Sequence, residues 1–369
     1  MSFFSDRTIL VTGACGTVGR ELVRQLLDCQ PREIRAIDTN ESEIFFLEQE
    51  LQTANRGRPH PVRTLCQIGD IRDRDKLNRM FSGVDIVLHT AALKHVILCE
   101  RAPFDAVQTN IIGVRNIIEA ALDNDVERVI FTSSDKAVNP TNVMGTSKLM
   151  GERLFTAANS LKMQRRTIFS STRFGNVLGS RGSVIPIFAR QIAAGGPVTL
   201  TDSRMTRFIM TLEESCRLVL AAAEKARGGE VFVTKMPVIQ IADLARVMID
   251  ELAEQHGFSA ARMPVTEIGA KPGEKLYEEL MSDEETRRTV ELTEMFAVLP
   301  AFRSVYEEIS YDYDDLVSRT VENAYVSSPA NAMSTEELAL WCRRHDLLAP
   351  WLKDAPILPM PGTERKRAA

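Results

Sequence analysis

The sequence predicts an α/β fold in which a doubly wound parallel Rossmann sheet carries a smaller, interleaved α/β lobe. In the first half, short apolar runs alternate with amphipathic stretches of helical periodicity. A glycine-rich turn joins the first apolar run to the first helical stretch. After about Phe174 this regular alternation stops, and turns containing glycine and proline become frequent. Strand–helix alternation is typical of parallel sheets with helices on both faces, which is the basis of the prediction.

Six strands are expected in the first half, and each is a short apolar run between helical or turn segments. They are Thr8–Thr12, Ile34–Asp38, Leu65–Ile68, Asp85–His89, Arg128–Thr132 and Ile168–Arg173. Two helices between them are clearly amphipathic, Glu21–Asp28 and Pro103–Leu122, because their aliphatic residues recur on one face. Together these elements predict a dinucleotide-binding domain over residues 1–175.

The second half is expected to form the smaller lobe and a C-terminal extension. A strand ending at Val198–Thr201, helices at Leu212–Ala226 and Ile241–Glu254, and a strand at Pro264–Ile268 predict a substrate lobe over residues 176–290. From Arg287 onward the sequence looks mostly helical and acidic, which predicts a helical extension over residues 291–369 with a loose tail.

Composition excludes several classes of function. The net charge is −5 and no long basic stripe occurs, which argues against nucleic acid or an anionic membrane as the main partner. The six cysteines are scattered without a CxxC pair, so we expect no metal site and no disulfide framework. No apolar run approaches the length of a membrane span. We therefore expect a cytoplasmic protein.

The segment from Thr12 to Gly19 has the spacing of a dinucleotide-binding turn. Gly13 permits the tight turn, Gly16 lets the backbone approach a pyrophosphate, and Gly19 lets the helix pack on the strand. Thr17 and Val18 begin the helix, whose N-terminus offers free N–H groups to phosphate. A glycine-rich turn without a ligand is the alternative, but the expected strand and helix favour a cofactor.

Further cofactor contacts are expected where the next strands end. Asp38 closes the second strand, where a carboxylate binds ribose hydroxyls and repels a 2′-phosphate, so NAD is favoured over NADP. A helix cap is the alternative role for Asp38. Asp70 and Ile71 follow the third strand and either meet the adenine or form a turn. Ala91 and Ala92 follow the fourth strand and allow close approach of a cofactor, or simply pack tightly.

The most informative stretch runs from Phe131 to Lys148. The end of the fifth strand delivers Ser134, Asp135 and Lys136 in succession, and a helix starting near Val143 supplies Lys148. In open α/β sheets, ligands bind at this carboxyl-end rim. A solvated loop ion pair is the alternative interpretation of Asp135 and Lys136.

Three motifs make the chain resemble the polysaccharide-biosynthesis branch of the extended short-chain dehydrogenases. These are the glycine turn, the His89–His95 run HTAALKH, and the Ser134–Gly145 run SDKAVNPTNVMG. The resemblance covers roughly residues 6–285, and most members of the branch are UDP-N-acetylglucosamine 4,6-dehydratases. Short-chain dehydrogenases usually have Tyr-x-x-x-Lys, whereas this chain has Met144 before Lys148. A thioether transfers no proton, but methionine recurs at this position in active members of the branch.

The resemblance implies a chemistry and a role for each group. Sugar carbon 4 is oxidised by NAD, carbon 5 loses a proton to the Lys136 position, and the Asp135 position protonates the hydroxyl leaving carbon 6. A lysine base needs a lowered pKa, which we expect from burial and from nearby Lys148. The base at carbon 4 stays open between Asp135 and a water chain through Ser134 and Lys148. Met144 inclines the prediction toward retention at carbon 5.

The remaining candidates are polar residues with a family counterpart and a plain structural alternative. We expect Lys148 to hold the nicotinamide ribose, Asn110 to support the catalytic lysine, and Lys94 and His95 to line the sugar pocket. An exposed helical lysine and a polar residue on a helix face are the alternatives for Lys148 and Asn110. The expected sugar-nucleotide contacts are Asn176, Ser183, Arg207, Lys271 and Glu274. Surface salt bridges are the alternative for these.

The sequence thus predicts a nucleotide-sugar 4,6-dehydratase that acts on UDP-N-acetylglucosamine, recycles NAD, and forms a homodimer or larger homo-oligomer. Two rivals remain. A 4-epimerase or dehydrogenase usually needs the missing tyrosine. A cofactor-binding protein without catalysis has no reason to keep Asp135, Lys136 and Lys148 together.

Overall fold

The computed structural model describes residues 3–161, 165–180, 183–269, 273–301 and 309–352. Its centre is a ten-stranded sheet in the order β16-β14-β15-β10-β6-β5-β4-β1-β2-β3. The seven strands from β10 to β3 are parallel. They are β1 (Thr8–Thr12), β2 (Glu33–Asp38), β3 (Arg63–Ile68), β4 (Ile86–His89), β5 (Arg128–Ser134), β6 (Ile168–Phe174) and β10 (Val231–Thr234). The predicted doubly wound parallel sheet is confirmed.

Helices cover both faces of this sheet, which explains why the central strands β1 and β4 are buried along their whole length. In β1, Ile9 and Val11 pack into one core with α1 (Thr17–Asp28), α2 (Glu41–Asn55) and α9 (Leu212–Lys225). Leu10 faces the opposite core, formed with α3 (Arg74–Phe81), α6 (Gly113–Asp123) and α7 (Val143–Leu161). The alternation of side chains along a strand produces this division.

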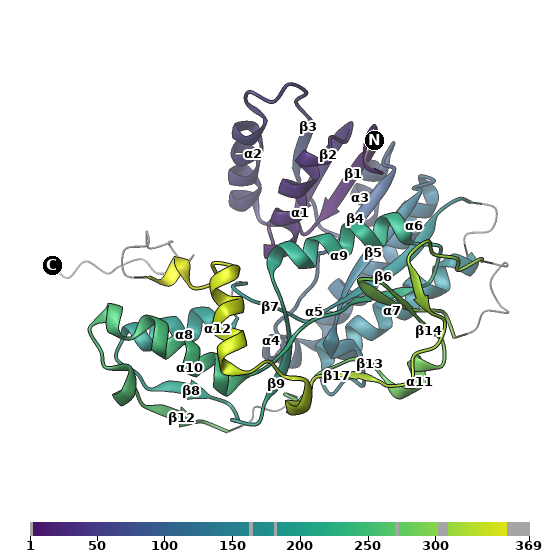
Figure 1. Cartoon of the computed structure of the whole chain (residues 1–369). Helices are drawn as coiled ribbons and strands as arrows, with labels where there is room; N and C mark the ends of the chain where they lie inside the picture. Colours follow the sequence, from purple (N-terminus) through teal and green to yellow (C-terminus); the bar gives the residue numbers. More distant parts are fainter. Residues whose placement is uncertain (1–2, 162–164, 181–182, 270–272, 302–308, 353–369) are drawn as a thin grey trace.

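A second lobe lies beside the sheet, at the lower left of Figure 1. Its helices α8 (Val184–Ala193), α10 (Ile241–Leu252) and α12 (Thr335–Arg344) enclose a separate apolar core with β8 (Val198–Leu200). β8 pairs with β12 (Val265–Glu267). A three-stranded sheet of β7 (Asn176–Val177), β9 (Thr206–Met210) and β11 (Val238–Gln240) is also present. The chain crosses between the lobes repeatedly, because α9 and β10 belong to the main domain.

The prediction of a mostly helical region after Arg287 is wrong. β14 (Thr289–Leu292), β15 (Met295–Val298) and β16 (Leu316–Ser318) extend the main sheet in antiparallel fashion. β17 (Tyr325–Val326) pairs with β13 (Glu279–Met281). The physical reason is that the apolar residues of this region can form strands at the open edge of the sheet beside β10. Burial of one face of these strands stabilises them more than local helix propensity would stabilise a helix. Among the described residues of this region, α12 is the one long helix.

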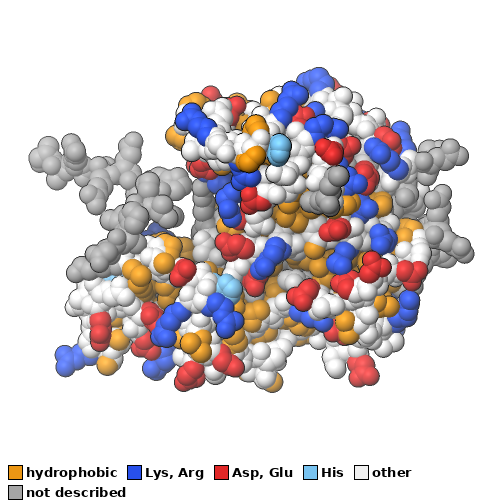
Figure 2. Space-filling view, turned by 45° about the horizontal axis from the view of Figure 1, so that its top comes forward, with side chains coloured by type: hydrophobic (Ala, Val, Ile, Leu, Met, Phe, Trp, Pro, Cys, Tyr) orange, Lys and Arg blue, Asp and Glu red, His pale blue; other side chains and the backbone are white. Residues whose placement is uncertain are grey.

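The surface carries both signs of charge. Figure 2 shows Lys, Arg, Asp and Glu side chains interspersed over the face that it presents, with hydrophobic side chains exposed between them. Within the described ranges, no helix is both long enough and apolar enough to span a bilayer. The same ranges contain no cluster of three or more acidic, histidine or cysteine side chains suited to a metal.

Candidate active site

The carboxyl ends of β1 and β4 meet at the glycine turn. Gly13 has a φ of +67°, and a Cβ at this position would lie 2.7 Å from the backbone of Ala91, directly after β4. Only glycine meets both demands. Gly16 is the N-cap of α1, Thr17 and Val18 begin the helix, and its first turn contains no acidic residue. Because Gly16 has no side chain to cap the helix, it leaves the main-chain N–H groups of the first turn without a side-chain cap, as an anion site requires.

Asp38 lies at the end of β2 and contacts the glycine turn. Its Oδ2 accepts a hydrogen bond from the Cys15 N–H at 3.0 Å, and its Oδ1 accepts one from the Asn40 N–H at 3.1 Å. The helix-cap role belongs to Asn40, whose side chain accepts from the Glu43 N–H at the start of α2. Asp38 is thus held beside the turn, where the predicted ribose contact requires it.

Asp70 and Ile71 form the turn that was the alternative interpretation. The Asp70 carboxylate pairs with Arg72 at 2.6 Å, and this hydrogen bonding lowers the pKa of Asp70. Ile71 is buried, and its carbonyl accepts a hydrogen bond from Asn116 of α6. Ala92 follows Ala91 and is likewise partly buried. A contact of Asp70 or Ile71 with adenine stays a prediction.

Ser134, Asp135 and Lys136 form one hydrogen-bonded cluster where β5 ends. Asp135 is 1% exposed, and its Oδ1 accepts hydrogen bonds from Ser134 Oγ at 2.6 Å, the Lys136 N–H at 2.8 Å and Lys136 Nζ at 3.0 Å. A short 3₁₀ turn over Asp135–Ala137 brings these groups together. The alternative of a solvated ion pair does not fit, because the carboxylate is buried.

The expected lowering of the Lys136 pKa is wrong. Burial does lower the pKa of Lys136, but the carboxylates of Asp135 and Glu278 more than offset it, and the net pKa is raised. Glu278 Oε1 lies 3.4 Å from Lys136 Nζ. Among the charges with the largest effect on Lys136, the cation is Arg207 and not the expected Lys148. In the free protein Lys136 is therefore an ammonium held between two carboxylates.

Glu278 is a site residue that the sequence analysis missed. It is 2% exposed, lies beside Lys136, and its Oε1 is 3.7 Å from Arg207 Nε. Burial and the charge of Asp135 raise its pKa. Asp135 Oδ2 and Glu278 Oε2 are both buried and have no hydrogen-bond partner in the described part of the chain. Buried acceptors without partners are uncommon and are expected where a ligand supplies the donor.

Met144 lies in the first turn of α7, and this turn packs directly against the loop that carries Asp135 and Lys136. It is 4% exposed and forms a small apolar cluster with Cys99 and Ala106. At Gly145, a Cβ would lie 2.1 Å from the carbonyl oxygen of Lys136, so only glycine allows this approach. The core role considered for Met144 is therefore observed.

Lys148 is buried one turn further along α7. Its Nζ donates a hydrogen bond to the Thr132 carbonyl oxygen at 2.9 Å and lies 4.7 Å from the Phe131 ring centroid. Burial lowers the pKa of Lys148 to about 8. The alternative of an exposed helical lysine does not fit this placement. Contact with the nicotinamide ribose stays a prediction.

Asn110 lies in a π-helical turn, Gln108–Ile112, inside what was predicted as one continuous helix. Such turns are frequent at functional sites. Its amide donates to the Leu93 carbonyl oxygen and to Ser147 Oγ, both at 2.9 Å, and accepts from the Leu93 N–H. Asn110 thereby holds the loop after β4 against α7 next to Lys148. The support is indirect, through Ser147.

The other predicted substrate residues lie around this cluster with different exposures. Lys94 and His95 are exposed, and His95 is the N-cap of α4 (Val96–Arg101). Asn176 is half-buried in β7, which pairs with β9. Ser183 is the N-cap of α8, and its buried Oγ has no partner among the described residues. The substrate roles of these residues stay predictions.

Arg207 reaches the cluster of Ser134, Asp135 and Lys136 through Glu278, and its guanidinium is buried. It donates to the carbonyl oxygens of Thr206 at 2.7 Å and Lys275 at 3.0 Å. A further bond to the Leu276 carbonyl oxygen is 3.3 Å long. The predicted phosphate contact therefore requires Arg207 to exchange some of these main-chain partners.

The segment from Gly273 to β13 covers the loop between β5 and α7, which follows Lys136. The Gly273 carbonyl oxygen accepts from Thr141 and Asn142, and Lys275 Nζ donates to the Val138 carbonyl oxygen at 2.9 Å. Glu274 is exposed in this segment. Lys271 lies outside the described residues.

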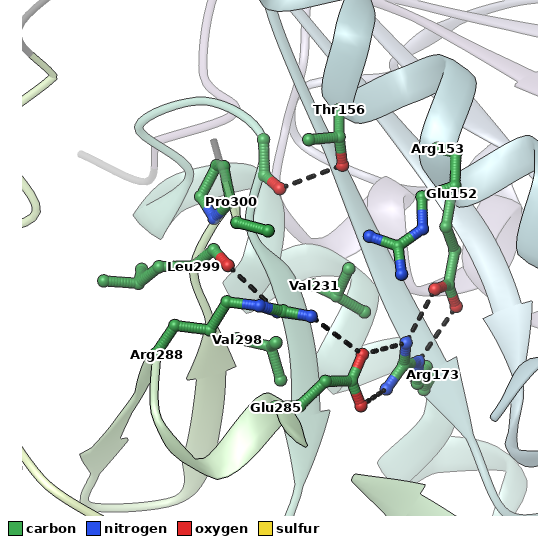
Figure 3. A pocket seen from close by; sticks show the side chains of 12 residues that line it. Glu152, Arg153, Thr156, Arg173, Val231, Glu285, Arg288, Val298, Leu299 and Pro300 are labelled. Carbon is green, nitrogen blue, oxygen red and sulfur yellow. Dashed lines mark hydrogen bonds and ion pairs between the residues drawn. The ribbon is translucent and has the colours of Figure 1, made fainter. Parts of the chain in front are cut away.

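A buried ion network joins β6, α7 and the segment after β13. Arg173 of β6 forms paired hydrogen bonds with Glu152 of α7 and with Glu285 of α11 (Asp283–Thr286), all 2.7–2.9 Å long. Figure 3 shows the two carboxylates on opposite sides of the guanidinium, with Arg288 beside Glu285. The small pocket here is lined by these charged side chains, by Arg153 and Thr156, and by residues of β10, of β15 and of the turn after β15. Arg173, Glu152 and Glu285 are paired with one another, so the network is structural.

Comparison with known proteins identifies the family. Residues 9–300 match the family described as polysaccharide biosynthesis protein. The chain belongs to this family. The predicted resemblance is thereby confirmed. A relative from Methanocaldococcus jannaschii, "Uncharacterized membrane protein MJ1061", is 51% identical over 81% of this chain and 87% of its own length. A UDP-N-acetylglucosamine 4,6-dehydratase (inverting) from Campylobacter jejuni is 34% identical over 94% of this chain and 97% of its own.

The X-ray structure of Pen from Bacillus thuringiensis superimposes with a TM-score of 0.84 at 41% identity, covering 94% of this chain and 99% of Pen. Family relatives also include a UDP-glucose 4-epimerase from Rickettsia canadensis, 37% identical over 80% of this chain and 83% of its own length. Some members are longer. The chain spans 46% of EpsC from Bacillus subtilis, to which it is 44% identical.

Proposed function

We propose that this polysaccharide biosynthesis protein is an NAD-dependent nucleotide-sugar 4,6-dehydratase that acts on UDP-N-acetylglucosamine. One observation carries the proposal. A carboxylate and an amine, Asp135 and Lys136, are held 3.0 Å apart at the carboxyl end of β5, while Met144 is buried where a tyrosine would otherwise serve. Elimination of water needs an acid and a base beyond the oxidation step, and this pair supplies both. The dehydratase relative supports the same reaction.

NAD fits the glycine turn. The N-cap of α1 is Gly16, which has no side chain to cap the helix. Gly13 and Ala91 approach closely and leave a narrow turn, and Asp38 is held beside this turn. These features suit a pyrophosphate and an adenosine ribose with free hydroxyls. When bound, NAD supplies reversible hydride acceptance. Lys148 is buried close to the end of β5, which supports a role in holding the nicotinamide end.

The residues of the cluster divide the proton chemistry. Asp135 accepts from three donors through Oδ1, while its buried Oδ2 is left for a substrate hydroxyl. Lys136 carries the amine that meets carbon 5. Because its pKa is raised in the free protein, it must lose a proton before it acts as a base. Met144 holds the loop without exchanging a proton.

The experiment is mass spectrometry after incubation with UDP-N-acetylglucosamine and NAD. Loss of one water supports the dehydratase. The 4-epimerase relatives favour a second candidate, which would leave the mass unchanged. NMR of the product then determines the configuration at carbon 5. The resemblance predicts retention, whereas the Campylobacter jejuni relative is named inverting. A homo-oligomer and a cytoplasmic location stay predictions.

A further inference from the structure

Glu278 is fixed beside Lys136 by contacts from a distant part of the chain. Its N–H donates to Ser327 Oγ at 2.9 Å, and Ser327 is fully buried. Thr206, next to Arg207, donates to the Ser327 carbonyl oxygen at 3.0 Å. A buried glutamate is costly unless it is paired. Holding one 3.4 Å from Lys136 Nζ therefore calls for a reason beyond stability.

The two carboxylates that flank Lys136 are held very differently. Asp135 Oδ1 accepts three hydrogen bonds of 2.6–3.0 Å, which stabilise its charged form. Glu278 Oε1 lies 3.4 Å from Lys136 Nζ and 3.7 Å from Arg207 Nε, and its Oε2 has no partner among the described residues. The charged form of Glu278 is thus less stabilised by hydrogen bonds than that of Asp135.

The positive charges around Glu278 differ in the same way. Arg207 keeps its proton in proteins, and its other N–H groups are bound to main-chain oxygens. Lys275 also lowers the pKa of Glu278, but its Nζ is bound to the Val138 carbonyl oxygen. Lys136 is therefore the cation beside Glu278 that can give up a proton.

We propose that Glu278 is a positioning residue that anchors the Lys136 ammonium and accepts one proton from it, leaving an amine able to attack the carbon-5 hydrogen. This inference rests on the proposed dehydratase function. One N–H bond of Lys136 breaks and one O–H bond of Glu278 forms, with no change of oxidation state. When substrate excludes water, a neutral amine–acid pair becomes easier to form than in the open site. Lys136 then takes the carbon-5 proton, returns one of the exchangeable protons of its ammonium group to carbon 5 after elimination, and recovers its own proton from Glu278.

The test compares three variants of the full chain with the wild type. Glu278→Gln keeps the shape but accepts no proton, Glu278→Asp keeps the carboxylate, and Glu279→Gln is the matched control. Glu279 contacts Asn139 and Lys275 instead of Lys136. The measurements are kcat, KM, melting temperature, UDP affinity, and incorporation of deuterium at carbon 5 from heavy water.

We expect Glu278→Gln to lower kcat by on the order of 10²-fold and to suppress deuterium incorporation equally, with KM and UDP affinity unchanged. Glu278→Asp should recover part of both, and Glu279→Gln should match the wild type. Wild-type kcat in Glu278→Gln would overturn the proposal. So would a loss that follows the melting temperature and is not recovered in Glu278→Asp. A wild-type protein that releases no water from UDP-N-acetylglucosamine or any other nucleotide sugar would overturn the proposed function, and this inference with it.

Discussion

Arg173 and Glu285 face each other in the protein interior through two hydrogen bonds of 2.8 Å. Glu152 accepts two more from the other edge of the same guanidinium. These residues come from β6, from α11 and from α7, the helix that carries Lys148. The network therefore joins the sheet, the helix beside the catalytic loop and the segment that follows Glu278.

Arg173→Ala should be strongly destabilising, because it leaves two buried carboxylates without their partner. Loss of one member of a buried ion pair typically costs about 3–5 kcal/mol. Urea unfolding monitored by fluorescence measures the change, and Arg165→Ala is a control because its pairing with Asp123 is half-exposed. A loss no larger than that of the control would show that the network contributes little.

Stability should fall in acid as Glu285 is protonated. Burial alone would raise the pKa of Glu285, but Arg173 outweighs it and holds the pKa at about 2, below its ordinary value of 4.5. A lowered carboxylate pKa stabilises the fold above the unfolded value, and this contribution is lost as pH falls from about 4.5 towards 2. The free energy of unfolding of Glu285→Gln should therefore depend less steeply on pH in that window than that of the wild type. The measurement is urea unfolding at several pH values, and an equal change of the unfolding free energy with pH in both proteins would contradict this.

Much of the fold was predictable because strand–helix alternation is a local pattern. The bounds of β1 are the predicted ones, and α7 begins at Val143 as expected. The region after Arg287 was not predictable in this way. Its strands are stabilised by pairing with β10 and with each other, contacts that have no local periodic signal.

The site was predictable where its residues follow parallel strands in succession, as Ser134, Asp135 and Lys136 do. Glu278 was missed because it is distant in sequence and adjacent to a second glutamate. Glu278 contacts Lys136 and Glu279 contacts Asn139, so the two side chains lie on different sides of the backbone. The sequence alone does not distinguish them. The raised pKa of Lys136 follows from Asp135 together with this missed neighbour, which outweigh the effect of burial.

Asp38→Ala should narrow the preference for NAD over NADP. The carboxylate now held by the Cys15 and Asn40 N–H groups would no longer bind ribose hydroxyls or repel a 2′-phosphate. Calorimetric titration with each dinucleotide measures the ratio of affinities, and Glu41→Ala, exposed at the start of α2, is the control. Tighter binding of NADP than NAD by the wild type would refute the cofactor assignment.

Arg207→Ala should weaken UDP binding by about tenfold or more if the guanidinium turns to a phosphate, because a charged hydrogen bond is worth roughly 1.5–3 kcal/mol. Titration with UDP measures this directly. Unchanged UDP affinity with a lower melting temperature would instead assign Arg207 to holding Glu278 and the Lys275 and Leu276 carbonyl oxygens.

The central claim is that Lys136, and not Met144, exchanges the proton at carbon 5. The most direct measurement is deuterium incorporation at carbon 5 and water loss from UDP-N-acetylglucosamine in heavy water. The two single variants Lys136→Ala and Met144→Leu are compared in the same assay. Met144→Leu keeps the volume of a buried side chain, so the comparison is of chemistry and not of folding. We predict that Lys136→Ala loses both signals by on the order of 10²–10⁴-fold, while Met144→Leu keeps them. Near-wild-type turnover and exchange in Lys136→Ala would contradict the account.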